Sequence, residues 1–402
     1  MHRRRVKITG IGPVTPAGIG KDEFWKGILE PVSRVQPYKE LGEEYGPFVA
    51  AHIPKFNVHD YVEINGVLKG AARHTLFAVA GTLLALKDAG IGEQTLKDAR
   101  SAIIIGTTLM DFGGIGSTIN AVNKRGIRAA QGRVVYTSNV ASVPGTVNHV
   151  LGITARTMSL QSSCCSGLDA IGHAAGLIAT GEIDIALCGG SEAPLYLCPL
   201  LELRSAGLTP PTDEMPERLS RPFDLWRTTG VVSEGACLFV LEPEESPREG
   251  YGYVTGYAYA NDEPDDLCSG IAVASRLAMA QAGVRPNQID AINAWGPGHK
   301  LIDAGEARAM VSVFQSVLPE IPVLSIKGAI GAPFGAAPAM QVATAALGLK
   351  YGLIPPTVNW EFPDPACPLN LSNRSRAVEY RVALVNAHGL AGVNASLVLQ
   401  RC

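Results

Sequence analysis

The amino-acid sequence predicts a layered α/β protein made of two similar halves. Short apolar runs typical of buried strands alternate with longer stretches whose apolar residues have helical spacing. Of the 402 residues, 47% are hydrophobic and only 18% are charged, which indicates a large packed interior. After the charged, turn-rich segment 242–250 the chain begins again with a stretch, 251–260, that is similar to its own start.

The first half contains five predicted strands and two predicted helices. One helix is expected over residues 71–90, where apolar residues at helical spacing end at a glycine. The other is expected over 168–180, and its small residues Gly167, Gly172 and Gly176 would let it pack closely on all sides, in the centre of the protein. The strands are predicted at residues 6–10, 102–106, 156–160, 183–189 and 236–241.

The second half repeats this pattern. Strands are expected at 251–260 and 289–295, followed by a glycine-rich loop and a helix within 325–352. Residues 382–399 predict two strands around a glycine turn. We therefore expect two halves, 1–245 and 246–402, with the chemistry between them.

Composition excludes several classes of function. The formal net charge of −3 gives no reason to expect nucleic acid as a partner. No apolar run has the length of a membrane span, and the start, MHRRRVKITGIG, matches neither a signal peptide nor an anchor. The eight cysteines show no CxxC and no paired zinc spacing, so we expect reduced thiols, a cytoplasmic location and no metal. The glycine-rich loops lack a nucleotide-binding fingerprint, and no cofactor is expected.

The stretch QSSCCSGLDAIG, residues 161–172, predicts an exposed nucleophile on a sharp strand-to-helix turn. A thiol at the start of a helix feels the positive end of the helix dipole and nearby free N–H groups, so we expect a lowered pKa for Cys164. The alternative is that Cys164 and Cys165 are two buried, inert thiols. We prefer the nucleophile for Cys164 and the buried thiol for Cys165.

Five motifs, in order along the whole chain, resemble the elongating β-ketoacyl-acyl-carrier-protein synthases of fatty acid and polyketide synthesis. They are ITGIGPVTPAG (8–18), SSCCSGLDAIGHA (162–174), RPFDLWRTTGVVSEGACLFVLE (221–242), SIKGAIGAPFGAA (325–337) and PPTVN (355–359). The resemblance implies a thiolase-like fold: two duplicated βαβαβαββ halves in a five-layer αβαβα arrangement. It also implies a dimer, either a homodimer or a heterodimer with another ketosynthase, and acyl carrier protein as a partner.

The resemblance also assigns roles to individual residues. Cys164 matches the family's nucleophile, and Leu390 matches the phenylalanine of the family's Gly-Phe-Gly-Gly turn. The N–H groups of Cys164 and Leu390 would then form a two-donor oxyanion hole. Lys69 and Arg73 lie in the stretch that resembles the family's carrier-docking region, although exposed basic residues are more often only a solvated surface.

The chain departs from the family at both active-site histidines. Trp295 stands in place of the first and Ala332 in place of the second, and Gln341 replaces the glutamate expected to pair with Lys327. The family histidines donate hydrogen bonds to the malonyl thioester oxygen during decarboxylation. Trp295 offers one N–H but cannot shuttle a proton, and Ala332 offers nothing, so ordinary malonyl condensation is doubtful.

Two other histidines could compensate. His388 replaces an aromatic residue beside the expected oxyanion donor, where it either packs as an aromatic substitute or acts as a base or donor to Cys164. His299 lies four residues after Trp295, where it is either a solvated loop residue or a substrate contact. Lys327 either holds its loop or biases the site electrostatically. We take Cys164, His388, Leu390 and Lys327 as candidate catalytic residues, and Trp295, Ala332 and His299 as candidate substrate contacts.

Three functions fit these observations. The first, which we prefer, is a divergent acyltransferase that accepts an acyl chain from acyl carrier protein on Cys164. The second is a silent, chain-length-factor-like partner subunit of a ketosynthase heterodimer, favoured by the missing histidines but not by the retained cysteine. The third is a thioester hydrolase on the same fold.

Overall fold

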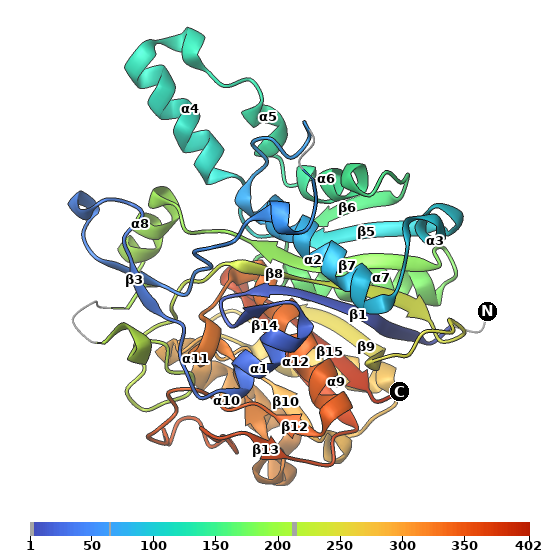
Figure 1. Ribbon diagram of the computed structural model, residues 1–402. Coiled ribbons are helices and arrows are strands. Elements are labelled where there is room, and N and C mark those ends of the chain that lie inside the picture. Colours follow the sequence, from blue (N-terminus) through green and yellow to red (C-terminus); the bar gives the residue numbers. More distant parts are fainter. Residues whose placement is uncertain (1–3, 64–65, 211–214) are drawn as a thin grey trace.

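A large mixed sheet runs through the molecule and consists of two five-stranded halves (Figure 1). The structure is a computed structural model that describes residues 4–63, 66–210 and 215–402. In spatial order the first half contains β1 (Val6–Thr15), β8 (Gly235–Pro243), β7 (Ile185–Glu192), β5 (Ser101–Gly106) and β6 (Arg156–Leu160), with the short β2 (Gly18–Ile19) paired to β1. The second half contains β9 (Gly252–Asn261), β15 (Val393–Gln400), β14 (Val382–Gly389), β10 (Ala291–Asn293) and β11 (Val323–Leu324).

The two halves have the same strand order and the same strand directions. In each half the first two neighbouring pairs are antiparallel and the last two are parallel. A short antiparallel pairing of β1 with β9, from Val6 opposite Val254 to Ile8 opposite Gly252, joins them. The predicted α/β fold with two duplicated halves is confirmed.

Helices cover both faces of each half, which gives five layers. Between the halves lie α7 (Ser166–Ala179) and α12 (Ala337–Tyr351), which contact each other and strands of both halves. Every residue of α12 from 337 to 349 is buried, as expected for a helix surrounded by protein. The outer layers are formed by α2 (Arg73–Ala89) and α6 (Ser142–Val150) on the first half, and by α9 (Ser269–Ala282) and α10 (Lys300–Phe314) on the second.

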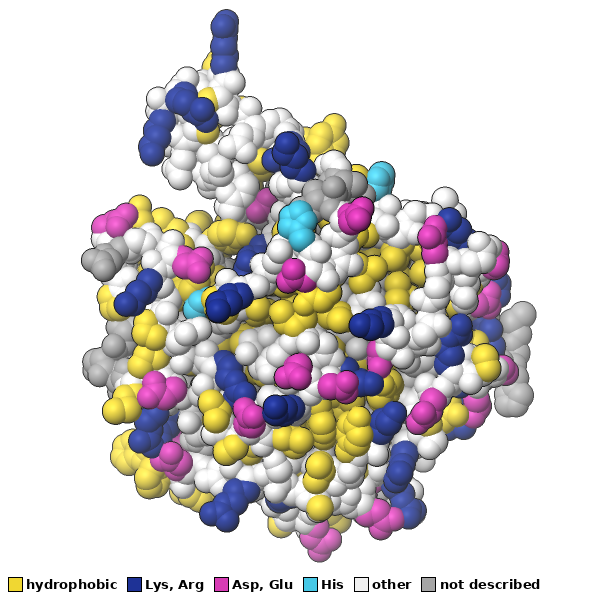
Figure 2. Space-filling view, in the orientation of Figure 1, with side chains coloured by type: hydrophobic (Ala, Val, Ile, Leu, Met, Phe, Trp, Pro, Cys, Tyr) yellow, Lys and Arg dark blue, Asp and Glu magenta, His cyan; other side chains and the backbone are white. Residues whose placement is uncertain are grey.

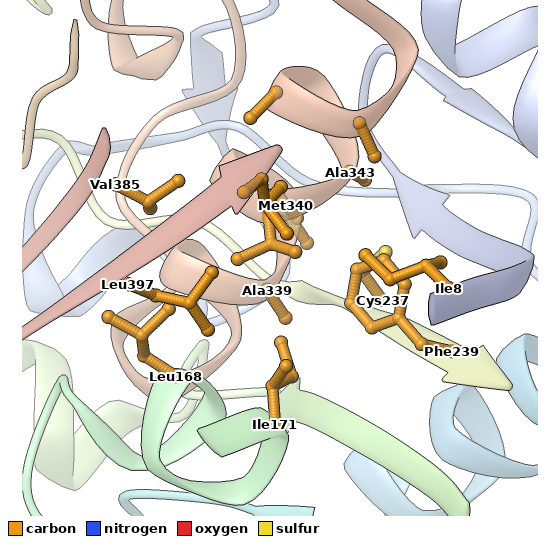
Figure 3. Packing of buried hydrophobic residues seen from close by; sticks show 14 of the residues in the cluster. Ile8, Leu168, Ile171, Cys237, Phe239, Ala339, Met340, Ala343, Val385 and Leu397 are labelled. Atoms are coloured by element: carbon orange, nitrogen blue, oxygen red, sulfur yellow. The ribbon is translucent and has the colours of Figure 1, made fainter. Parts of the chain in front are cut away.

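The shared core lies between the halves, around α7 and α12. Figure 3 shows Leu168 and Ile171 of α7 close to Met340 of α12, with side chains of β1, β8, β14 and β15 around them. Glycines allow this close packing. A Cβ on Gly172 would lie 2.2 Å from the ring of Tyr257, and a Cβ on Gly167 would lie 2.4 Å from the carbonyl oxygen of Gly335. The predicted central position of this helix is confirmed.

Most of the remaining elements lie at the periphery. The peripheral helices are α1 (Lys21–Leu29), α3 (Glu93–Asp98), α4 (Phe112–Arg125), α5 (Val134–Thr137) and α8 (Leu197–Ser205). In Figure 1, α4 and α5 project away from the body of the molecule. The short helix α11 (Lys327–Ile330), in contrast, is completely buried. Two small sheets pair β3 (Gln36–Tyr38) with β4 (Phe48–Ala50), and β12 (Leu353–Ile354) with β13 (Arg376–Ala377).

The duplicated topology brings three chain segments to one place. Strand β6 leads into the turn with Cys164, and the parallel strand β10 ends just before Trp295. The turn between β14 and β15, residues 389–392, reaches the same region from the second half. The candidate site is therefore built where the two halves meet.

Candidate active site

Cys164 lies on a strained turn between β6 and α7. Ser163, just before it, has a φ of 53°, in the left-handed region that residues other than glycine rarely occupy. The turn is held by neighbours: the Ser162 N–H donates to Ser166 Oγ at 3.0 Å, and Thr108 Oγ1 donates to the Ser163 carbonyl at 3.0 Å. Such strain persists only where the surroundings enforce it, and it is concentrated at functional sites.

The β14–β15 turn places a second backbone group against this cysteine. The Leu390 N–H points at the Cys164 sulfur, and a Cβ on Gly389 would lie only 3.0 Å from the Cys164 nitrogen. Within the described residues, neither the Cys164 N–H nor the Leu390 N–H donates to an oxygen. The Leu390 N–H contacts only the Cys164 thiol, so both N–H groups could turn to a carbonyl oxygen once an acyl group is on the sulfur.

Cys164 lines an apolar pocket with about 80 Å³ of solvent-accessible space. Cys165 lies outside the pocket, and its thiol is directed at the Val393 carbonyl, 3.5 Å away. The pocket contains six of the seven predicted site residues, all except Lys327. Its lining residues are Cys164, Leu203, Leu208, Thr229, Gly230, Val231, Val232, Trp295, Pro297, His299, Ile302, Ala332, Phe334, His388 and Leu390.

The expected lowering of the Cys164 pKa is wrong. Burial of the thiol raises its pKa to about 12, and the nearby carboxylate of Glu192 acts in the same direction. The hydrogen bonds from Ser163 and Leu390 and the charge of Lys327 oppose this increase but do not overcome it. The thiol is therefore neutral near pH 7, and its proton must leave when the sulfur attacks.

Lys327 lies behind the pocket wall and is completely buried. Its Nζ donates to the Trp295 carbonyl and, at 3.0 Å, to Gln341 Oε1, and it lies 4.0 Å from the centroid of the Trp295 ring. Burial lowers the pKa of Lys327, and the carboxylate of Glu306 acts against this shift. Glu306, in turn, accepts hydrogen bonds from the N–H groups of Trp295 and Gly296, both at 2.8 Å.

Gln341 completes this buried network. Its amide nitrogen is directed at the carbonyls of Asn293, Ala294 and Asn386, at 3.1, 2.8 and 3.0 Å. A carboxylate could not donate to these three oxygens. The residue that replaces the expected glutamate therefore takes part in this network as a donor.

Trp295 and Ala332 occupy the pocket wall without supplying a titratable group. The Trp295 ring is 4% exposed and packs against the Lys327 ammonium. The Ala332 N–H donates to the Val231 carbonyl at 2.7 Å, so its backbone is used in the fold. At these two positions the site offers apolar surface.

The two pocket histidines are held differently. His299 is the N-cap of α10, where its Nδ1 accepts from the Ile302 N–H at 3.4 Å, and burial beside the positive charge of Arg227 lowers its pKa. His388 lies at the end of β14, 3% exposed, with Nδ1 2.9 Å from Asn394 Oδ1. The Asn394 amide nitrogen is 2.7 Å from Asp262 Oδ1.

Glu192 is a residue of the site that the sequence analysis missed. It is completely buried at the end of β7 and accepts from the N–H groups of Thr108 and Leu109 at 2.7 and 3.1 Å. Burial raises its pKa to about 7. Thr108 also holds the Ser163 carbonyl, so Glu192 braces the nucleophile turn. The available signal was an acidic residue directly after the buried strand IALCGGS.

Of Lys69 and Arg73, the two residues predicted to dock acyl carrier protein, only Lys69 remains a candidate. Arg73 is engaged by Glu234, with two hydrogen bonds of 2.7 Å, and packs on the ring of Phe77, so it is not a free surface cation. Lys69 is exposed and lies beside Arg133, which donates to its carbonyl at 2.7 Å. Docking at Lys69 stays a prediction.

Across residues 4–63, 66–210 and 215–402, no group of histidine, cysteine and carboxylate side chains has a metal-binding arrangement. Over the same ranges, no helix is both long enough and apolar enough to cross a membrane.

Comparison with known proteins places this chain in a family. Residues 3–246 match the family model of the beta-ketoacyl synthase N-terminal domain, and residues 250–361 match that of its C-terminal domain. The 3-oxoacyl-[acyl-carrier-protein] synthase 2 of Rhizobium meliloti is 31% identical, over 99% of each chain, and that of Coxiella burnetii is 29% identical, over 100% of this chain and 99% of the relative.

Comparison with solved structures leads to the same family. A structure described as the ishigamide ketosynthase/chain length factor has a TM-score of 0.93 at 29% identity, with complete coverage of both chains. A type II polyketide ketosynthase, solved with its acyl-carrier protein and bound to a hexaketide, has a TM-score of 0.91 at 26% identity, again covering both chains completely. The chain therefore belongs to the beta-ketoacyl synthase family.

Proposed function

We propose that the protein is an acyltransferase of the 3-oxoacyl-[acyl-carrier-protein] synthase type that accepts an acyl chain from acyl carrier protein on Cys164. The observation that carries the proposal is the pairing of the Cys164 thiol with the Leu390 N–H at an apolar pocket. In this step the sulfur bonds to the thioester carbonyl carbon, the bond to the carrier sulfur breaks, and the Cys164 proton ends on the carrier thiol. The N–H groups of Cys164 and Leu390 stabilise the oxyanion.

The second half of the family reaction, malonyl decarboxylation, is weak or missing in this proposal. Losing a single oxyanion donor costs about 10²–10³ in rate in other enzymes, and here both histidines are replaced. Trp295 and Ala332 contribute packing, and Lys327 is turned toward Trp295 and Gln341. We assign Lys327 a supporting role in this network, and His299 a donor role at the pocket wall.

Acyl carrier protein is the proposed donor and docks near the pocket mouth. Residues 112–155 contain four basic residues and no aspartate or glutamate, so the projecting α4–α5 segment attracts anions. Figure 2 shows Lys and Arg side chains collected on this projection. One solved relative is described in complex with its acyl-carrier protein, which supports the same class of partner here.

We propose that a second chain of the ketosynthase type packs against the open edge of the sheet. Strand β6 is the last strand of its half, and its first residues are exposed. On the nearby projection, Ile127, Val135 and Tyr136 are 84%, 69% and 74% exposed. An unpaired edge beside exposed apolar side chains invites association. We therefore propose a dimer, with residues 1–245 and 246–402 as the two halves of each subunit, in the cytoplasm.

A second candidate function is a catalytically silent, chain-length-factor-like subunit. The observation that favours it is the replacement of both histidines by Trp295 and Ala332. It would explain a dimer that forms only with a second ketosynthase, and sedimentation of the protein alone and with such a partner distinguishes the two arrangements.

Intact-mass analysis tests the main proposal. The protein is incubated with acyl carrier proteins loaded with chains of different length, and the mass is measured with and without hydroxylamine, which cleaves thioesters. The proposal predicts an added acyl mass that maps to Cys164. A protein that takes no acyl group from any carrier would be the silent subunit.

A further inference from the structure

The two histidines of the pocket are fixed in opposite hydrogen-bonding states. At His299, Nδ1 accepts the Ile302 N–H at the start of α10. A neutral imidazole with Nδ1 as acceptor carries its proton on Nε2, so His299 can only donate from Nε2. This leaves His299 suited to bind a carbonyl oxygen and unsuited to take a proton there.

At His388 the assignment is reversed because Asn394 has no choice of orientation. The Asn394 amide nitrogen is directed at acceptors only: Asp262 Oδ1 at 2.7 Å and the Gly392 carbonyl at 3.0 Å. The amide oxygen must then face His388 Nδ1, 2.9 Å away. An oxygen accepts, so Nδ1 carries the proton and Nε2 holds the lone pair.

The lone pair on Nε2 of His388 is open to the pocket. No hydrogen bond to it is made by the described residues, yet it is not among the polar atoms that are sealed away without a partner. His388 lines the same pocket as Cys164. On the other side of the ring, Asp262 Oδ2 lies 3.9 Å from Nδ1.

We propose that His388, aligned by Asn394 and Asp262, activates water against an acyl group on Cys164, so that the protein hydrolyses the thioester it forms. This inference rests on the proposed acylation of Cys164 and adds a second step to it. The water oxygen bonds to the thioester carbonyl carbon while Nε2 takes a water proton. The carbon–sulfur bond then breaks, the proton passes from Nε2 to the sulfur, and the products are a free carboxylic acid and the Cys164 thiol.

Cys164, His388 and Asn394 together supply a base that the residues in place of the family histidines cannot. Trp295 and Ala332 take no proton, and His299 uses its acceptor nitrogen as a helix cap. In the described part of the pocket, His388 is the imidazole with a free acceptor nitrogen. General-base assistance of this kind contributes about 10²–10⁴-fold to a rate.

The experiment starts from the acylated protein, so that the rate of acylation does not enter the result. Protein charged by an acyl carrier protein is separated from the carrier, and loss of the acyl mass and release of free acid are followed with time. His388→Gln keeps a donor for Asn394 but has no basic nitrogen, and His388→Phe keeps an aromatic ring. His149→Gln, on the exposed face of α6, is the matched control.

We expect both His388 variants to slow deacylation about 10²-fold, whereas His149→Gln deacylates like the unmodified protein. Asn394→Ala should slow deacylation in the presence of His388 and have no further effect in the His388→Gln background, which a merely structural role would not produce. Wild-type deacylation in His388→Phe, or an equally stable acyl group in all variants, overturns the hydrolysis proposal and leaves acylation intact. If no acyl group ever forms, both proposals fall together.

Discussion

The two walls of the pocket differ in the chemical groups that they carry. On one wall, the nucleophile turn of the first half meets the Leu390 N–H of the second half, as our proposal of an acyl-accepting site requires. On the opposite wall are Trp295 and Ala332, with Gln341 behind them, and these residues stand in place of the polar residues of the resemblance and supply packing and buried hydrogen bonds. In our proposal, an oxyanion hole made of backbone N–H groups survives side-chain replacement, whereas decarboxylation, which needs side chains, does not.

The comparison also separates the two half-reactions by the chemistry that each requires. Acyl transfer needs a thiol, two N–H groups and an apolar pocket, and all of these are present around Cys164. Decarboxylation needs donors that stabilise an enolate, and the positions that would supply them are Trp295 and Ala332. In our proposal, the protein therefore holds an acyl chain without extending it.

The largest effect is expected from removing the nucleophile. Cys164→Ala should abolish acylation completely, whereas Cys165→Ala should retain it, because the Cys165 thiol is directed at Val393 outside the pocket. Intact mass after incubation with acyl carrier protein measures both. In the unmodified protein, limited iodoacetamide should label Cys164 first. Label on Cys165 or on a distant cysteine ahead of Cys164 would contradict this assignment of the two thiols.

A large effect on stability is expected at the opposite wall. Lys327→Met leaves the Trp295 carbonyl and the Gln341 oxygen without their buried donor, so the free energy of unfolding should fall by about 2–4 kcal/mol. Chemical denaturation measures this loss. Because the network supports the fold in our account, the folded fraction should still acylate Cys164. A stable variant that has lost acylation would instead give Lys327 a direct catalytic role.

A smaller effect is expected on the pH dependence of stability, and it determines the pH at which assays of the two walls should be compared. His74 is buried, and burial lowers its pKa to about 4, from about 6.5 in the unfolded chain. Below pH 6.5 the unfolded chain binds a proton that the folded protein does not, so the contribution of His74 is complete above pH 6.5 and is lost as the pH falls toward 4. Relative to His74→Gln, the wild type should lose at most about 1.4 kcal/mol per pH unit in this window.

Denaturation curves of both proteins at several pH values test this contribution. The difference between them isolates His74 from Glu192 and Asp303, whose raised pKa values of about 7 act in the opposite direction. A difference that does not change between pH 4 and 6.5 would contradict the neutral state of buried His74. Assays of acylation and decarboxylation are best compared above pH 6.5.

Much of the fold could be predicted from the sequence because its central elements are buried on both faces. The run AIIIG at 102–106 became β5, and the helix expected over 71–90 became α2, which ends at Gly90. The first strand was predicted too short, at 6–10, because glycine and proline follow it. It extends to Thr15, since Gly12 permits the close approach of α2, where a Cβ would lie 1.9 Å from the Gly81 carbonyl.

The site could be predicted only in part. Motifs located Cys164 and the replaced histidines, because these depend on positions along the chain. The raised pKa of Cys164 depends on depth of burial, which no motif records. The state of His388 depends on Asn394, in β15, and on Asp262, just after β9, which meet only in the folded protein.

The most direct test of the account measures both half-reactions in one sample. The protein is given acyl and malonyl carrier proteins, and the acyl mass on Cys164 and the release of carbon dioxide are followed beside a family synthase that has both histidines. The account predicts acylation of Cys164 with carbon dioxide release at least about 10²-fold below that of the control. Carbon dioxide release at the rate of the control, retained after both His388→Ala and His299→Ala, would contradict it.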